Sequence, residues 1–255
     1  MAIFPLPQRL GSLHNDVIAY ASAIQCTIAE HGGCQSLASE ALNVLVYNAV
    51  LTHRGVRSLC EEGWTPITPI LNRTLLDIFA NCIALLNRPD SADYMGFKYI
   101  SDFYRKWLVE PDITEPERRE AFDALEALVA KLSPADQERA RTLIREGRPR
   151  TYWFQPEYNT TKELLEFSPE DIYRIYRLLS PITHGGFAAR ILFKDDPRSE
   201  DINPREHPRN TVRSIAASCR LLLEVCHVQD QRDNHGVGEE TYQELLQRIH
   251  GLRET

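Results

Sequence analysis

The chain has 255 residues, of which 43% are hydrophobic and 25% are charged, the balance of an ordinary globular protein. Its formal net charge of −7 argues against a broad nucleic-acid-binding surface, although it leaves room for a local basic groove. The sequence has no apolar run of the ~18 residues that a membrane span needs, and its first residues do not resemble a secretion signal. Six cysteines without a Cys-x-x-Cys pair favour buried thiols in a reducing, cytoplasmic setting.

Helical periodicity begins early in the chain. Four amphipathic helices are expected before residue 111, separated by glycine and proline breaks. The fourth of them is rich in aromatic residues, whereas the third is apolar nearly all round. The expected ranges are 10–31, Ser36–Glu62, Ile70–Asn87 and Asp90 to about Glu110.

The second half of the chain carries clear signals for helix starts. Thr114, followed by Glu115-Pro116-Glu117, predicts an N-cap with acidic residues in the first turn of a helix. Ser133-Pro134 repeats the pattern, with proline just inside the helix. The remaining expected elements are a loop at 147–159, a helix capped near Ser168, an exposed loop at 194–208, and helices at about 209–231 and 239–252.

These elements predict an all-α fold. No segment alternates as a half-buried strand does, and no repeat of fixed period is visible. We therefore expect a multi-helix bundle of long amphipathic helices with a smaller peripheral helical segment. Residues 1–255 form a single domain in this interpretation, with a helical insertion at about 111–167. The alternative is a division into two domains.

The helix after Ser168 carries the most informative pattern in the chain. Spacings of three and four place its side chains along one face. Hydroxyls, a guanidinium, an imidazole and a glycine pair together are suited to handling an anion. Pro181 is expected to interrupt or kink the helix, because proline lacks an N–H and crowds the preceding turn. A histidine that merely caps the helix end is the structural alternative. The residues of the pattern are Tyr173, Tyr176, Arg177, Ser180 and His184, followed by Gly185-Gly186.

A second polar line lies on the otherwise apolar helix expected at 70–87. Arg73, Asp77 and Asn81 fall four residues apart, so they share one face of that helix. One interpretation is an ion pair between Arg73 and Asp77, or a strip where the helix meets water. The other is that the line faces a polar pocket shared with the Tyr173–His184 pattern.

Arginine and aromatic residues also gather near residue 150. Arginines beside aromatic rings can hold a phosphate backbone and stack on bases, which makes four residues candidate RNA contacts. The alternative is a solvated helix face, with the tryptophan packed into the bundle. The four residues are Arg145, Arg148, Arg150 and Trp153.

The usual motifs for metal and cofactor chemistry are missing. Glu224-x-x-His227 is half of the signature of carboxylate-bridged di-iron bundles, and no second Glu-x-x-His occurs. The sequence also has no His-Glu-x-x-His, no phosphate-binding glycine loop, no Gly-x-Gly-x-x-Gly and no Gly-x-Ser-x-Gly. We therefore expect no metal and no cofactor.

Two resemblances follow from these motifs. Arg73-Thr74-x-x-Asp77 together with Tyr176-x-x-x-Ser180-x-x-x-His184-Gly185 resembles a widespread uncharacterised family of helical bacterial proteins, filed as a domain of unknown function. The resemblance covers about 40–110 and 150–195 and implies no settled activity. The spacing from Arg177 to His184 is similar to the Arg-x(four to six)-His motif of HEPN-type ribonucleases, the higher eukaryotes and prokaryotes nucleotide-binding superfamily. These are small helical bundles that often work as dimers in toxins and phage defence.

The second resemblance implies a metal-independent endoribonuclease that acts on single-stranded RNA as a homodimer. His184 would move a proton and Arg177 would neutralise charge on the phosphorane. Tyr173, Tyr176, Ser180, Arg73, Asp77 and Asn81 would bind the substrate or orient the catalytic groups. One alternative is a non-enzymatic ligand-binding or scaffold protein with a buried polar network. Another is an enzyme that acts on a small phosphorylated or carboxylated molecule.

Overall fold

The computed structural model describes residues 6–88, 91–146, 152–183, 208–233 and 236–252. Within these ranges every regular element is a helix, so the expected all-α class is confirmed. The elements are α1 (Gln8–Glu30), α2 (Leu37–Glu61), the 3-10 turn η1 (Thr65–Ile67), α3 (Thr68–Leu86), α4 (Ala92–Leu108), α5 (Glu115–Ala130), α6 (Pro134–Arg145), α7 (Thr161–Leu165), α8 (Glu170–Thr183), α10 (Pro208–Asp233) and α11 (Glu239–Gly251).

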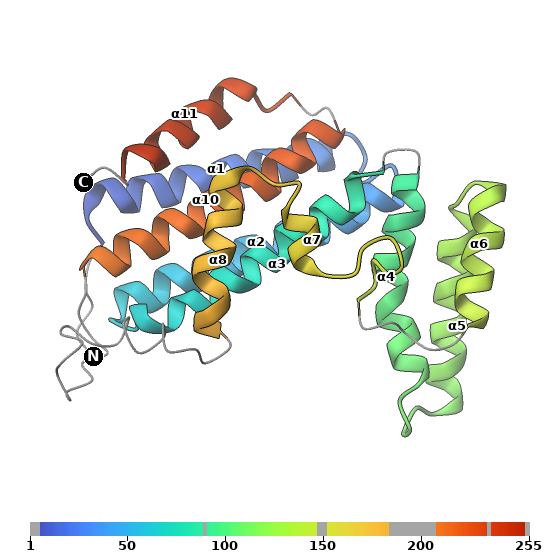
Figure 1. Cartoon of the computed structure of the whole chain (residues 1–255). Helices are drawn as coiled ribbons and strands as arrows, with labels where there is room; N and C mark the ends of the chain where they lie inside the picture. The colour runs from blue at the N-terminus through green and yellow to red at the C-terminus, as the bar shows by residue number, and fades with distance from the viewer. Residues whose placement is uncertain (1–5, 89–90, 147–151, 184–207, 234–235, 253–255) are drawn as a thin grey trace.

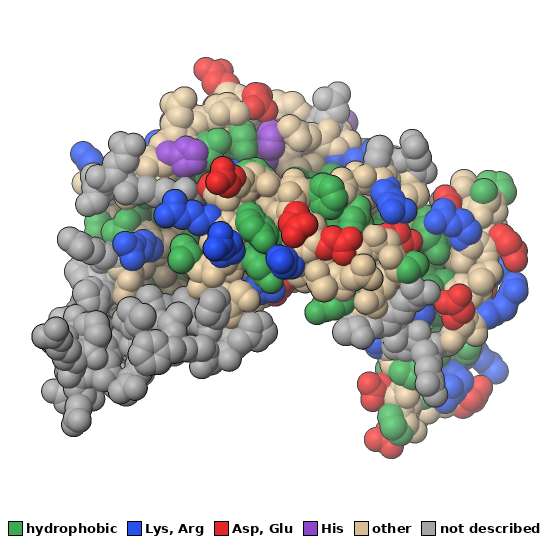
Figure 2. All heavy atoms as spheres, in the orientation of Figure 1, with side chains coloured by type: hydrophobic (Ala, Val, Ile, Leu, Met, Phe, Trp, Pro, Cys, Tyr) green, Lys and Arg blue, Asp and Glu red, His purple; other side chains and the backbone are tan. Residues whose placement is uncertain are grey.

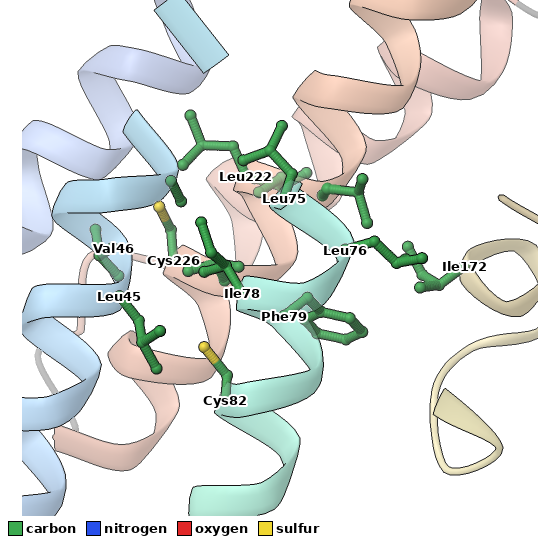
Figure 3. Packing of buried hydrophobic residues seen from close by; sticks show 14 of the residues in the cluster. Leu45, Val46, Leu75, Leu76, Ile78, Phe79, Cys82, Ile172, Leu222 and Cys226 are labelled. Carbon is green, nitrogen blue, oxygen red and sulfur yellow. The ribbon is translucent and has the colours of Figure 1, made fainter. Parts of the chain in front are cut away.

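Helix α10 occupies the centre of the bundle, with α1, α2 and α3 packed around it (Figure 1). Helix α11 covers α1 and α10, while α8 lies across α3. The buried side chains of α3 reach both neighbours: Leu75 points toward Leu222 of α10, and Leu76 points toward Ile172 of α8 (Figure 3). Helix α3 therefore joins the central bundle to the helix that carries the Tyr173–Ser180 pattern.

The burial of α3 explains its unusual composition. Contrary to the expectation from the sequence, one helix among the described residues, α3, is long and apolar enough by composition to cross a membrane, because a single Arg73–Asp77 pair is all that interrupts its apolar residues with charge. More than half of that stretch is buried inside the bundle, as expected for a core helix of a globular fold. The apolar sequence of α3 thus reflects contacts with helices on several sides.

A smaller helical unit extends from one end of the bundle, as the sequence predicts. Helices α5 and α6 form a hairpin that packs on α4 (Figure 1). The hairpin and α4 share a separate small core that includes Phe97, Leu125 and Val129, all fully buried. The predicted helix starts are confirmed here. Thr114 and Glu117 form a reciprocal capping box, and the Ser133 hydroxyl accepts a hydrogen bond from the Asp136 amide.

Gly96 allows α4 to cross α2 at very short range. A Cβ atom at this position would lie 2.5 Å from the backbone carbon and oxygen of Leu37. Such a contact is far inside van der Waals distance, so any side chain would push the two helices apart. This glycine thereby fixes where the peripheral unit joins the bundle.

Two local features differ from the expectations. Helix α8 continues through Pro181 to Thr183, so an interruption at that proline is wrong, while a kink there stays a prediction. Proline near a helix end removes one hydrogen bond without requiring the backbone to leave the helical conformation. The five-residue helix α7 is not predicted, because a single turn has no visible periodicity. The hydroxyl of Ser168 donates to the Leu165 carbonyl at the end of α7. The loop expected at 194–208 lies outside the described residues up to position 207.

The core contains a pair of stacked histidines that the sequence does not reveal. The rings of His14 on α1 and His53 on α2 lie 4.2 Å apart at 20° to each other, and both side chains are buried. His53 Nδ1 lies 2.9 Å from the Ser218 hydroxyl of α10. Burial, followed by the nearby charge of Arg57, lowers the pKa of His14 to about 4. Burial also holds the pKa of His53 well below its usual value, so both rings are neutral in this core.

All six cysteines are free thiols, and four of them are buried, as expected from their spacing. Burial raises the pKa of Cys60 to about 11. Burial also raises the pKa values of Cys82, Cys219 and Cys226. A thiol with a raised pKa has little thiolate and is a poor nucleophile or metal ligand.

Candidate functional site

The polar line on α3 meets the polar pattern on α8. Arg73 Nη2 lies 3.0 Å from Oδ1 of Asp77, one turn further along α3. The Arg73 guanidinium carbon also lies 4.8 Å from the centre of the Tyr176 ring on α8. The predicted ion pair between Arg73 and Asp77 is therefore confirmed, and Arg73 also contacts the Tyr173–Ser180 pattern, whereas the shared polar pocket stays a prediction. A cation over an aromatic face is held by the negative potential of the ring.

The exposure of the two charged side chains differs. The Arg73 side chain is 17% exposed and the Asp77 side chain 45% exposed, so the pair lies at the rim of the bundle. The Arg73 Nη1 atom is buried and has no hydrogen-bond acceptor among the described residues. The guanidinium therefore has spare hydrogen-bonding capacity on its buried side, and a planar guanidinium binds oxygen-bearing groups most strongly.

The side chains of α8 form three strips that differ in exposure: buried, half-buried and exposed. Ile172, Ile175 and Leu179 are buried against the bundle. Tyr173 and Tyr176 are half-buried, with their rings 6.0 Å apart at 23°. This stacking extends the aromatic surface that lies under the Arg73 guanidinium.

The remaining residues of the pattern lie toward solvent or outside the described ranges. Arg177 is exposed, and Ser180 is half-buried beside the tyrosines. His184, the proposed proton-transfer residue, lies outside the described residues, which end at Thr183 in this part of the chain. The structure therefore joins Arg73, Tyr173 and Tyr176 into one site and leaves the predicted pairing of Arg177 with His184 as a prediction.

The α3 line continues to a tryptophan that the sequence associates with RNA. Trp153 Nε1 donates to Oδ1 of Asn81 at 2.8 Å. The indole ring also meets the edge of Tyr99, with 5.2 Å between centroids. Burial raises the pKa of Tyr99 to about 12, consistent with its place beneath the indole. Trp153 is thus packed against the bundle, which is the structural alternative left open by the sequence.

Of the three arginines that the sequence proposes as RNA contacts, the structure describes Arg145. Arg145 is exposed at the end of α6, and its Nη2 lies 3.8 Å from Glu138. An exposed pair at this distance contributes little to stability and leaves the guanidinium free to exchange partners. Arg148 and Arg150 lie outside the described residues.

A buried ion network that the sequence does not reveal anchors α8 to the bundle. Arg220 of α10 donates from Nε to Asp171 of α8 at 3.0 Å, and from Nη1 to Glu224. The Tyr242 hydroxyl of α11 also donates to Glu224. The Arg220 side chain is only 3% exposed, so its charge requires these partners. One signal was available: Arg220 and Glu224 are four residues apart in an otherwise apolar run.

The same network explains the Glu224-x-x-His227 motif. Glu224 is engaged by Arg220 and Tyr242, and the His227 ring stacks on the Tyr242 ring with centroids 3.7 Å apart. Across the part of the chain that the structure describes, no three His, Cys, Asp or Glu side chains come together as a metal site. The motif has a structural role here.

Two surface cavities lie away from the α3–α8 site. One of about 290 Å³ is lined by α4, α6 and residues 155–157. The other, of about 390 Å³, lies between α3, α10 and Phe167. Neither includes Arg73, Tyr176 or Arg177. Neither of these two cavities therefore belongs to the α3–α8 site.

Comparisons with known proteins give a family but no activity. No curated protein matches the chain significantly, and no solved structure does so. One family model matches residues 39–199, a range that begins within the first turn of α2, extends past α8 and includes both polar lines. Because this match covers more than half of the sequence, the chain belongs to DUF5677, a family of unknown function.

Proposed function

We propose that the α3–α8 face binds single-stranded RNA and that the protein is a HEPN-like, metal-independent endoribonuclease, of the kind used as toxins or in phage defence. The observation that supports this best is the contact between Arg73 and Tyr176. It joins a partly unpartnered guanidinium to a stacked tyrosine pair on the helix that also carries Arg177. Guanidinium groups bind phosphate and aromatic rings stack on unpaired bases, so this combination suits a single strand.

The chemistry assigned to the site needs no metal. The His184 imidazole would take a proton from the ribose 2′-hydroxyl or give one to the leaving oxygen. Arg177 would neutralise the charge that develops on the phosphorane. Arg73, held by Asp77, would bind a neighbouring phosphate, and the Tyr176 and Ser180 hydroxyls would donate to phosphate oxygens.

The surface charge favours a short RNA segment as the substrate. The net charge is −7, and basic and acidic side chains are interspersed on the face shown in Figure 2. A protein that tracks a long nucleic acid usually presents a continuous basic stripe. The exposed Arg174 and Arg177 on α8 instead offer a local positive region. We therefore expect cleavage within loops or single-stranded ends, without extended contacts to a duplex.

The test is incubation of the purified protein with end-labelled single-stranded RNA in the presence of a chelator. We expect cleavage by the unmodified protein and its loss in Arg177→Ala and in His184→Ala. Arg174→Ala is the matched control, because it removes one arginine from the same positive region of α8 but Arg174 has no assigned role in the cleavage step. Cleavage that survives in His184→Ala, or disappears equally in Arg174→Ala, would refute the assignment.

The second candidate function is a non-enzymatic ligand-binding or scaffold protein. It is favoured by the Arg73–Asp77 ion pair and by the hydrogen bond from Trp153 to Asn81, because these contacts also tie the surface of the bundle together. In this case no RNA is cleaved under any condition. For such a protein, Arg73→Met should lower the unfolding temperature and leave the affinity for RNA unchanged. The ribonuclease proposal instead predicts that Arg73→Met binds RNA more weakly than the unmodified protein.

A further inference from the structure

The outer face of α2 carries apolar side chains that the bundle does not cover. Val44, Tyr47 and Leu51 are spaced by three and four residues, so they form one stripe along the helix. All three are exposed, and Tyr47 is 62% exposed. Single exposed hydrophobic residues are common on proteins, but a contiguous stripe usually marks an interaction surface.

The stripe extends onto the neighbouring helix. Helices α2 and α3 lie side by side (Figure 1). Gly55 of α2 admits Leu71 of α3, whose Cδ1 would lie 3.2 Å from a Cβ atom at position 55. Ile67 at the end of η1 and Ile70 in the first turn of α3 precede Leu71 in the chain and are also exposed. We call the surface formed by Val44, Tyr47, Leu51, Ile67 and Ile70 the α2 apolar face.

Two opposite charges of α2 lie at equal distances from Tyr47 along the helix. Glu40 lies seven residues before Tyr47 and Arg54 lies seven residues after it. Seven residues are almost two helical turns, so the two charges flank the apolar stripe on the same side of the helix. An antiparallel copy of α2, centred on Tyr47, would therefore place each Glu40 against the Arg54 of the other copy.

We propose that the α2 apolar face is a homodimer interface, with a two-fold axis at Tyr47 and α2 antiparallel to α2 of a second copy. A two-fold interface must be self-complementary, and the order acidic, apolar, basic along one helix satisfies that condition. The stripe supplies the central contact and the two Glu40–Arg54 pairs form its rim. The ribonuclease resemblance implies a homodimer without saying which surface forms it; this inference adds the surface and the register, and its test does not depend on RNA cleavage.

The alternative occupants fit this surface less well. An anionic membrane would require basic residues around the apolar stripe, whereas one end carries Glu40 and the whole chain is acidic. Within one copy, Lys131 lies 2.9 Å from Glu40, but both side chains are exposed. An exposed carboxylate in a weak surface pair can accept a second cation, so Lys131 does not prevent the contact with Arg54.

A charge exchange tests both the interface and its register. The mass in solution is measured by size exclusion with light scattering over a range of concentrations. We expect a dimer for the unmodified protein, a shift toward monomer of at least tenfold in dissociation constant for Glu40→Arg and for Arg54→Glu, and recovery in the double variant. A double variant no more dimeric than the single ones would overturn the register. A monomeric unmodified protein would overturn the interface.

A cysteine at the proposed axis gives an independent test. In a Cys26→Ser background, which removes the exposed native thiol, Tyr47→Cys should form a disulfide-linked dimer under mild oxidation. Two cysteines on the axis can approach within the distance that a disulfide requires. Phe103→Cys is the control, because Phe103 is an equally exposed aromatic residue on α4. Equal crosslinking of both variants, or none at position 47, would contradict the proposed geometry.

Discussion

Acid should unfold this protein largely through its stacked histidines. His14 and His53 are buried with neutral rings, and neither can take up a proton without placing a charge in the core next to Arg57. In the unfolded chain both rings bind protons freely below about pH 6.5. The unfolded state therefore binds more protons than the folded state as pH falls from about 6.5 to 4. Stability is fully present above about pH 6.5 and decreases below it.

The size of the effect follows from the pKa of His14. With a pKa of about 4 in the folded protein and about 6.5 in the unfolded chain, a change from about pH 7 to pH 4.5 lowers the free energy of unfolding by roughly 2.5 kcal/mol. His53 adds to this loss, because its pKa is also depressed by burial. Such a loss is a large fraction of the total stability of a typical domain.

The informative variant is His14→Phe, which keeps a flat ring in the stack but cannot take up a proton. The Nδ1 atom of His14 has no hydrogen-bond partner among the described residues, so its removal leaves no partner of that atom unsatisfied. The free energy of unfolding is measured in urea at about pH 7 and pH 4.5. Any packing strain from the larger ring affects both values, so the difference between them isolates the titration.

We expect the pH-dependent loss to shrink by roughly 2 kcal/mol in His14→Phe relative to the unmodified protein. His31→Phe is the control for replacing a histidine by phenylalanine outside the core, because His31 is exposed at the end of α1. An unaltered difference between the two pH values in His14→Phe would show that the buried pair does not govern acid unfolding.

Three further substitutions test the packing that supports the site. Gly96→Ala should cost about 1–3 kcal/mol, because the new Cβ meets the Leu37 backbone, and thermal unfolding should detect it. Leu76→Ala should lower the free energy of unfolding by about 2–5 kcal/mol, because it opens a cavity between α3 and α8. Unfolding at the same urea concentration as the unmodified protein would contradict this. Arg220→Met should cost about 3–5 kcal/mol at neutral pH, because it leaves the buried carboxylate of Glu224 without its cation; a loss below ~1 kcal/mol would speak against the network.

The sequence predicts the local features of this fold well. Periodicity and helix caps locate most helices to within a few residues, and the Thr114 capping box forms as its spacing suggests. The Arg73–Asp77 pair is likewise a local contact, because residues four apart on a helix are neighbours in any fold. These features depend only on the chain within two helical turns.

Contacts between distant segments could not be obtained in this way. The meeting of Arg73 with Tyr176 depends on how α8 packs across α3, which is set by side chains such as Leu76 and Ile172 that look like ordinary core residues. The histidine pair joins α1 and α2 and gives no sequence signal, since each histidine alone fits a helix face. The interruption predicted at Pro181 is wrong, because the loss of one backbone hydrogen bond at a proline does not by itself end a helix.

The central position of α10 has a practical consequence for work on other DUF5677 members. The family match ends at residue 199, whereas α10 begins at Pro208 and fills the middle of the bundle. A recombinant fragment trimmed to the matched region would lack the surface against which Leu75 is buried, and Asp171 would lose its cation. A fragment of this chain should therefore extend past the matched region to include α10, and the sequence of a relative should be examined beyond its own match for such a helix before a boundary is chosen.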